Sequence, residues 1–321
     1  MSNEQPIPIR ELSVPSLVRK VSAVIAAANR IILGKEAPIR LALVCLITGG
    51  HLLIEDIPGV GKTTLAHTLA RLLGLSFQRI QFTSDLLPAD IIGASIYERQ
   101  SGEFRFHAGP IFSNLVLTDE VNRATPKTQS ALLEAMEERQ ITVDGTTRPL
   151  PQPFFVIATQ NPAHQVGTYP LPESQLDRFL MRIGLGYPGE QAERGLLKGR
   201  DRRELLHDVQ PILSAPELMA LRNAAFGLQV SDALLDYLQA LVRYTRESPR
   251  YENGLSPRAT LALKHASQAW ALLMGRNAVI PEDLQAVVPG VVAHRLRLKS
   301  THESSTASAI AKELLEAVPV P

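Results

Sequence analysis

The segment Asp56–Thr64 constrains this chain more than any other. It reads Asp-Ile-Pro-Gly-Val-Gly-Lys-Thr-Thr, between a short apolar run over 52–55 and a helical pattern over 62–73. Glycines let a backbone turn tightly enough for its N–H groups to face phosphate, and the dipole of the following helix points at the same oxygens. A strand, a Gly-rich turn and a helix in this order predict a phosphate-binding loop, or P-loop.

The positions of this loop have distinct expected roles. We predict that the Lys62 amine reaches the β- and γ-phosphates of a nucleotide and that the Thr63 hydroxyl binds Mg²⁺. Asp56 stands where the usual pattern has glycine. Because aspartate enters the left-handed backbone region more readily than most residues, we expect the turn to be kept. The predicted nucleotide-binding residues of the loop are Asp56, Ile57, Pro58, Gly59, Val60, Gly61, Lys62, Thr63 and Thr64.

Two further apolar runs end in polar residues. The run 115–118 leads into the adjacent acids Asp119 and Glu120. Burying two acids is costly unless a cation offsets them, so we predict Asp119 as a Mg²⁺ ligand and Glu120 as the general base that polarises the attacking water. The run 154–158 leads to Asn161, whose amide is expected to contact the γ-phosphate and the water. Alone, each run is more typical of an ordinary strand end or turn; the upstream P-loop favours the catalytic interpretation.

Buried strand patterns alternate with helical patterns up to about residue 189, which indicates an α/β domain with a parallel sheet. Two hairpins interrupt the alternation, one around Gly102 and one at Asp144-Gly145. Beyond a Gly- and Pro-containing linker at 184–189 the chain is helical in pattern. We predict a flexible N-terminus over 1–15, an ATPase core over 16–189 and a helical domain over 190–321. The helices expected from periodicity are 16–33, 62–73, 192–206, 216–225, 232–246, 257–274 and 281–296.

Composition narrows the classes of function. Lys and Arg number 33 against 32 Asp and Glu, so the chain lacks the basic excess of most nucleic-acid binders. The longest apolar stretch, 39–54, is interrupted by Gly49, Gly50 and His51 and is shorter than the roughly 20 residues that a membrane span needs. Cys45 is the single cysteine, which excludes a disulfide within the chain. These features predict a soluble cytoplasmic protein, with nucleic acid an unlikely partner.

Taken together, the motifs resemble the MoxR family of AAA+ ATPases over roughly residues 15–300. Residues 119–124 resemble the family's extended Walker B motif. Residues 132–145, LLEAMEERQITVDG, resemble the segment that follows it, and residues 171–179 resemble the segment that holds the arginine finger. The resemblance implies a AAA+ P-loop αβα core with a parallel sheet and a smaller C-terminal all-helical lid domain.

The resemblance also assigns roles to single residues. Asn161 falls on sensor 1, and Arg178 falls on the arginine finger, which acts on ATP bound by the neighbouring subunit. Arg258, at the start of a lid helix, falls on sensor 2. Gly34 and Lys35 match the region near the adenine.

Three arginines have alternative interpretations from the residues themselves. Arg178 is also compatible with a surface salt bridge, which would contribute at most about 1 kcal/mol. Arg258 is also compatible with a side chain that solvates a helix start. Arg123 is either a second contact to a neighbouring subunit or a structural ion pair.

The function implied by the resemblance is an ATP-hydrolysing remodeller with ATP and Mg²⁺ as cofactors, assembled as a hexameric ring. Its expected partners are a von Willebrand factor A domain protein and a client enzyme complex that needs assembly or insertion of a metal or cofactor. Two alternatives are a nucleic-acid motor and a nucleotide-gated binding module with little turnover. The near-neutral charge argues against the motor. The set Lys62, Asp119, Glu120, Asn161 and Arg178 argues against the module.

Overall fold

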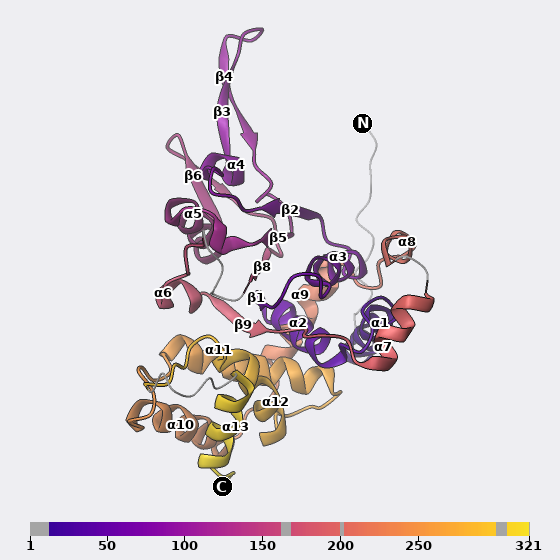
Figure 1. Cartoon of the computed structure of the whole chain (residues 1–321), viewed down its shortest axis with the longest axis vertical. Coiled ribbons are helices and arrows are strands. Elements are labelled where there is room, and N and C mark those ends of the chain that lie inside the picture. The colour runs from indigo at the N-terminus through magenta and orange to yellow at the C-terminus, as the bar shows by residue number, and fades with distance from the viewer. Residues whose placement is uncertain (1–12, 162–167, 200–201, 300–306, 321) are drawn as a thin grey trace.

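A parallel five-stranded sheet forms the centre of the fold in the computed structural model, which describes residues 13–161, 168–199, 202–299 and 307–320 (Figure 1). Its strand order is β2-β5-β8-β1-β9, so the strand before the P-loop lies between β8 and β9. This arrangement confirms the predicted α/β class. The strands are β1 (His51–Glu55), β2 (Phe77–Gln81), β5 (Leu115–Asp119), β8 (Phe155–Gln160) and β9 (Phe179–Ile183).

Helices cover both faces of the sheet, because alternate residues of a buried strand point to opposite sides. Leu52 and Ile54 of β1 pack with one group of helices, and Leu53 between them faces the other. The first group is α1 (Val14–Ile31), α2 (Glu36–Thr48) and α3 (Lys62–Leu72); the second is α4 (Pro88–Ile92) and α5 (Pro126–Glu138). Two single turns, η1 (Val121–Arg123) and α6 (Glu173–Leu176), follow β5 and precede β9. The predicted N-terminal segment 1–15 lies mostly outside the described residues, and α1 already begins at Val14.

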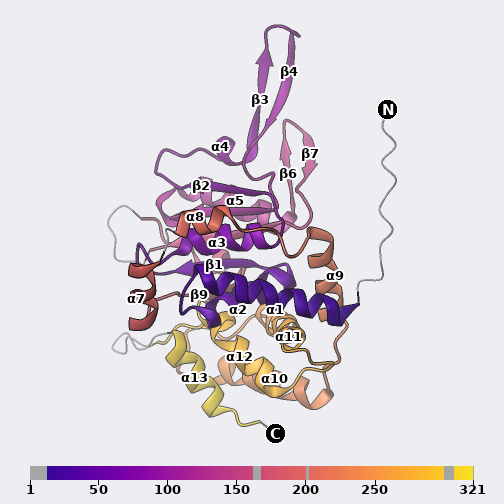
Figure 2. The same ribbon diagram turned by 90° about the vertical axis from the view of Figure 1, so that its right-hand side faces the viewer.

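Two hairpins leave the sheet at the predicted turns. β3 (Gly93–Glu98) and β4 (Glu103–Ala108) project far from the core, as Figures 1 and 2 show. β6 (Gln140–Val143) and β7 (Thr146–Pro149) form the second hairpin beside α5. The turn residues Gly102, Asp144 and Gly145 all have positive φ, at 73°, 51° and 73°. Both hairpin predictions are confirmed.

Within the residues that the structure describes, seven helices follow the sheet. The prediction of one continuous helix over 192–206 was wrong. The first helix ends at Lys198, Gly199 is extended, and a second helix begins at Arg202. The helix predicted over 281–296 ends at Val292, and the helix Ala307–Ala317 was not predicted. The seven are α7 (Glu190–Lys198), α8 (Arg202–His207), α9 (Ala215–Phe226), α10 (Asp232–Glu247), α11 (Pro257–Leu273), α12 (Pro281–Val292) and α13 (Ala307–Ala317).

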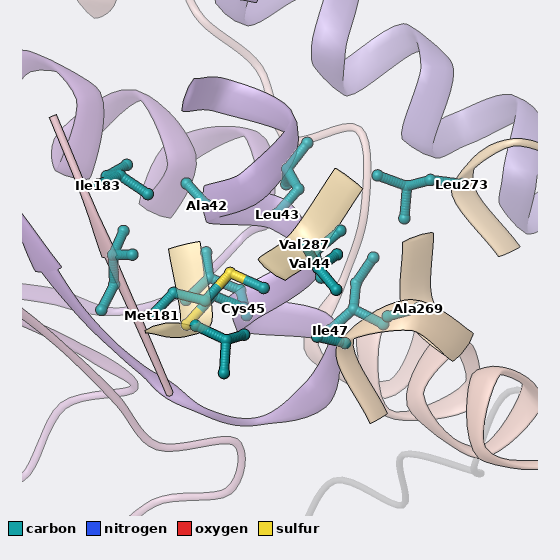
Figure 3. Close-up of a cluster of buried hydrophobic side chains, with 14 of the residues drawn as sticks. Ala42, Leu43, Val44, Cys45, Ile47, Met181, Ile183, Ala269, Leu273 and Val287 are labelled. Atoms are coloured by element: carbon teal, nitrogen blue, oxygen red, sulfur yellow. The ribbon is translucent and has the colours of Figure 1, made fainter. Parts of the chain in front are cut away.

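These helices pack in two places. α8 lies against α1 and α3, while α10 to α13 gather at the end of the molecule opposite the β3–β4 hairpin (Figure 2). α11 and α12 join this bundle to α2 and β9, and Figure 3 shows the contact, with Val44 and Ile47 of α2 beside Val287 and Ala269. The bundle and the sheet domain therefore share one apolar core. The domain boundary near residue 190 stays a prediction.

Within the described part of the chain, no helix is both long enough and apolar enough to cross a membrane.

Candidate nucleotide site

The P-loop leaves the carboxyl end of β1 and turns directly into α3. Its two glycines have positive φ, 85° at Gly59 and 97° at Gly61, and Gly61 caps the helix. A Cβ atom added at either glycine would meet no other atom within 4 Å, so the space in front of the loop is open. An open concavity beside the amino end of a helix suits an anion such as the phosphates of a nucleotide.

The Lys62 amine lies inside this loop. Its Nζ donates to the carbonyl oxygens of Asp56, at 2.5 Å, and Ile57, at 3.3 Å. It also donates to Oδ1 of Asn161 at 3.1 Å, which joins the P-loop to the end of β8. Burial lowers the pKa of Lys62, and the nearby carboxylates of Asp56, Asp119 and Glu120 partly offset that effect. Three acids around one lysine keep a positive charge where phosphate is expected.

Asp56 keeps its place in the loop by a different means than we expected. Its φ is not positive, so the left-handed region plays no part. Instead its carboxylate accepts three backbone N–H bonds, from Ile57 at 2.8 Å and from Leu185 and Gly186 at 2.5 and 2.6 Å. Carboxylates that accept several N–H groups are held firmly. Asp56 therefore ties the P-loop to the linker that follows β9.

Asp119 and Thr63 bring oxygen atoms together beside the loop. The Thr63 hydroxyl donates to Oδ2 of Asp119 at 3.3 Å. The other oxygen, Oδ1, accepts from the Thr159 hydroxyl at 2.8 Å, which fixes the carboxylate. A carboxylate and a hydroxyl are hard oxygen ligands of the kind that Mg²⁺ takes beside phosphates. The residues present therefore fit the predicted metal.

Glu120 lies next to Asn161. Its Oε1 accepts from Nδ2 of Asn161 at 3.2 Å, and its Oε2 lies 3.0 Å from Nε of Arg123. Its backbone N–H donates to the Thr159 hydroxyl at 3.0 Å. Arg123 thus forms an ion pair within the chain, and its contact to a neighbouring subunit stays a prediction. Lys62, Asn161 and Glu120 thus form one connected group.

Sequence reasoning missed two residues of this group, Arg79 and Gln81 on β2. Arg79 Nε donates to Oδ2 of Asp119 at 2.8 Å, and Nε2 of Gln81 donates to Oε2 of Glu120 at 3.1 Å. The register of β2 and β5, which pairs Gln81 with Asp119, creates both contacts. No local motif marks these positions, so only the strand pairing could have revealed them.

A cavity of about 210 Å³ adjoins the P-loop, where the resemblance places the adenine. Lys35 lines it, and its amine donates to the carbonyl oxygen of Tyr187 at 2.6 Å. Gly34 makes the preceding turn, with φ at 69°, and a Cβ there would lie 3.1 Å from Ala192 of α7. The apolar part of the lining suits a flat ring. The other lining residues include Ile31, Ile32, Val60, Thr64, Pro188 and Leu196.

Arg178 and Arg258 come together at a second place. Both pair with Glu137 of α5, Arg178 through Nε at 2.9 Å and Arg258 through Nη2 at 2.5 Å. This place lies at the amino ends of the strands, opposite to the P-loop, because Phe179 pairs with His51 at the start of β1. The P-loop follows the other end of that strand, about 15 Å away at roughly 3.3 Å per residue.

Comparisons with known proteins agree with the fold. Residues 51–181 match the family described as "ATPase family associated with various cellular activities (AAA)", and residues 243–314 match the AAA lid domain. Chaperone MoxR1 of Mycobacterium tuberculosis is 42% identical over 290 residues, covering 88% of this chain and 76% of that protein. The uncharacterized protein YeaC of Bacillus subtilis is 45% identical, covering 91% and 92%.

A solved structure is similar over nearly the whole chain. It is the crystal structure of a "putative ATPase" from Cytophaga hutchinsonii, with a TM-score of 0.88, 38% identity and coverage of 96% of this chain and 97% of that one. The fold and the P-loop define a AAA+ protein with a helical lid. More narrowly, the chain belongs to the MoxR family of AAA+ ATPases, which confirms the predicted resemblance and fold.

Proposed function

We propose that this protein hydrolyses ATP with Mg²⁺ and uses the energy to remodel a client protein. The observation that carries the proposal is the connected group of Lys62, Asn161 and Glu120, beside the oxygens of Asp119 and Thr63. A phosphate-binding lysine, a pair of metal-binding oxygens and a carboxylate held by an amide are the parts that phosphoryl transfer to water requires. A simple binding module needs no such carboxylate.

Each residue of the site has its own role in hydrolysis. Lys62 and the N–H groups of the loop hold the phosphates, and the cavity beside Lys35 holds the base. Glu120 accepts a proton from the attacking water, with Asn161 and Gln81 fixing the carboxylate. When bound between Thr63 and Asp119, Mg²⁺ would neutralise charge on the phosphate oxygens.

A second copy of the chain is needed to complete this site. Arg178 and Arg258 lie at the amino ends of the parallel strands, while the P-loop lies at the carboxyl ends of the same strands. In this structure these arginines therefore lie away from the P-loop of their own chain. Repeating this head-to-tail contact produces a closed ring when the rotation between copies allows it. We propose a hexamer in which Arg178 and Arg258 both reach the nucleotide of a neighbour.

The client role rests on the relatives. One of them is named a chaperone. We propose a chaperone-like function in the assembly or metal and cofactor loading of an enzyme complex, together with a protein that carries a von Willebrand factor A domain. The projecting β3–β4 hairpin offers a surface for such contacts (Figure 2). The lone buried thiol of Cys45 suits a reducing compartment, and we propose the cytoplasm.

The test of hydrolysis and of the ring uses three variants. Glu120→Gln should keep ATP binding and lose turnover, since the amide cannot accept a proton. Arg178→Ala and Lys62→Ala should each lose turnover alone, by about 10³-fold or more. Mixed in equal amounts, the last two should regain activity, because some P-loops then meet an intact arginine. Full turnover by Glu120→Gln would refute the assigned base, and no regain at any ratio would refute the ring.

The client can be sought with the same Glu120→Gln variant, loaded with ATP in a lysate of its source. Recovery of a von Willebrand factor A protein or an immature metalloenzyme supports the chaperone role. Recovery of nucleic acid with nuclease subunits would instead support the motor.

A further inference from the structure

The residue before Arg178 is held by the C-terminal helices. Arg295, just beyond α12, donates from Nε to Oδ1 of Asp177 at 2.6 Å. Its Nη2 donates to the carbonyl oxygens of Asp177, at 3.2 Å, and Phe179, at 2.7 Å. Its Nη1 donates to the carbonyl oxygen of Leu180 at 3.0 Å. With its side chain only 5% exposed, Arg295 thus binds the backbone on both sides of Arg178.

Asp177 has a second partner on another helix of the bundle. Its Oδ2 accepts from the Ser256 hydroxyl at 3.2 Å, and Ser256 caps α11 by accepting the N–H of Ala259 at 3.1 Å. Arg258 follows Ser256 by two residues in the first turn of that helix. One carboxylate therefore joins the segment that carries Arg178 to the helix that carries Arg258.

Arg178 and Arg258 are thus held both at their guanidinium groups and through the segments that carry them. Glu137 pairs with their guanidinium groups, and the Asp177 carboxylate joins the two segments that carry them. We propose that Asp177, held by Arg295 and Ser256, is a positioning residue that keeps Arg178 and Arg258 as one unit whose place follows the C-terminal helices. The inference rests on the proposed function, in which this unit serves the nucleotide of a neighbouring subunit.

Charge and geometry explain why an aspartate is needed. Arg295 presents a planar fork of donors, and a carboxylate accepts from such a donor while keeping its second oxygen for Ser256. Asparagine has nearly the same size, but its NH₂ group cannot accept, so one of the two anchors is lost. The Arg178 segment is then held less firmly, although the bonds from Arg295 to its backbone carbonyls remain. A displacement of about 1 Å at a reacting group can cost roughly 10²-fold in rate.

Glu173 provides a matched control on the same segment. It also contacts the bundle, through Arg297 at 3.1 Å and Asn253 at 3.3 Å, but it is half exposed and lies five residues before Arg178. Exposed ion pairs of this kind contribute little. Glu173→Gln should therefore leave turnover unchanged.

The experiment compares Asp177→Asn with Glu173→Gln in the full chain. Asp177→Asn should bind a fluorescent ATP analogue with unchanged Kd, because its own P-loop is intact, while kcat falls by roughly 10–100-fold. Mixed in equal amounts with Lys62→Ala, it should regain activity well above the sum of the two. In random rings about a quarter of the sites then combine an intact P-loop with an intact arginine unit. The double variant Asp177→Asn/Lys62→Ala should rescue neither parent.

Three results would overturn the inference. The first is unchanged kcat in Asp177→Asn. The second is a loss that Lys62→Ala does not rescue although it rescues Arg178→Ala, which would mean a defect within one chain; the ring would then stand. If Lys62→Ala rescues neither variant, the proposed ring fails and the inference falls with it. Should Asp177→Asn fail to fold, Ser256→Ala keeps the pair of Asp177 with Arg295 and removes the Ser256 hydroxyl, which also removes the α11 cap at a cost of about 1 kcal/mol. The same mixing test should give a loss of roughly threefold or more that Lys62→Ala rescues.

Discussion

Glu120 has a backbone that few residues with a side chain adopt. Its φ is 56°, in the left-handed region, and its backbone N–H is held by the Thr159 hydroxyl. Such conformations cost about 1 kcal/mol or more and persist where neighbours enforce them. Here the turn directs the carboxylate at Asn161 and Gln81. The position of the proposed base is therefore set by the backbone as well as by its partners.

His51 should make the fold sensitive to acid. It is buried at the start of β1, where Nδ1 accepts from the N–H of Val156 at 3.0 Å and Nε2 lies 3.1 Å from the carbonyl oxygen of Met136. Burial lowers its pKa to about 4. The unfolded chain, with a pKa near 6.5, binds the proton first. Stability is therefore lost as pH falls from about 6.5 to 4, by on the order of 3 kcal/mol.

The measurement is chemical denaturation of wild type and His51→Gln across this pH range. The variant should be less stable at pH 7, by about 1–3 kcal/mol, because one of its hydrogen bonds is lost. It should also lose less stability on acidification. His107→Gln is the control, since His107 is exposed on β4 and should behave as wild type. An unchanged pH dependence in His51→Gln would contradict the assignment.

At this scale the sequence predicted what depends on local geometry. The P-loop glycines, Lys62 and Glu120 could be assigned because their roles follow from neighbours along the chain. Arg79 and Glu137 could not, because their partners come from strand pairing and from helices far away in sequence. Asp56 shows the same limit: its position was predicted, but not the bonds to the linker after β9 that hold it.

Among the elements, the β3–β4 hairpin depends on close backbone contact at its base. A Cβ at Gly93 would lie 2.2 Å from the carbonyl oxygen of His107 and 2.7 Å from the nitrogen of Gly109, and φ there is 94°. At the tip, Gly102 has φ at 73°, but a Cβ would meet nothing within 4 Å. The base therefore has both a conformational and a steric requirement for glycine, and the tip only a conformational one.

Gly93→Ala should therefore be more harmful than Gly102→Ala. We expect a loss of about 2 kcal/mol or more at the base and about 1 kcal/mol at the tip. Limited proteolysis of the hairpin and thermal unfolding measure both effects, since local opening exposes the strands to cleavage. Equal sensitivity of the two variants would contradict the packing at the base.

Periodicity predicted some helices and not others for a physical reason. α10 and α1 each have one apolar face, and both were predicted to within a few residues. α2 is buried on nearly all sides over Ala42–Ile47, so it shows no alternation, only an apolar run. Such a run does not distinguish a buried helix from a strand. α7 and α8 were merged because Gly199 alone was too weak a signal of a break.

For the whole molecule, the separation of the arginines from the P-loop predicts that turnover depends on assembly. We expect ATP hydrolysis per chain to fall when the protein is diluted below the concentration at which copies associate. Binding of nucleotide per chain should fall less, because the P-loop and the cavity beside Lys35 belong to one chain. Turnover against concentration, with sedimentation on the same samples, measures both. Constant turnover in a monomeric sample would contradict the shared site.

The opposite placement of P-loop and arginines across one sheet also gives each copy a direction. In the proposed arrangement, each copy offers its P-loop to one neighbour and its arginines to the other. An open row of copies therefore ends with a P-loop that no arginine reaches and, at the other end, with arginines that reach no P-loop. A row of any length has one complete site fewer than it has copies, and only closure supplies the last. The number of hydrolysing sites per assembly would thus distinguish an open row from a closed ring without imaging.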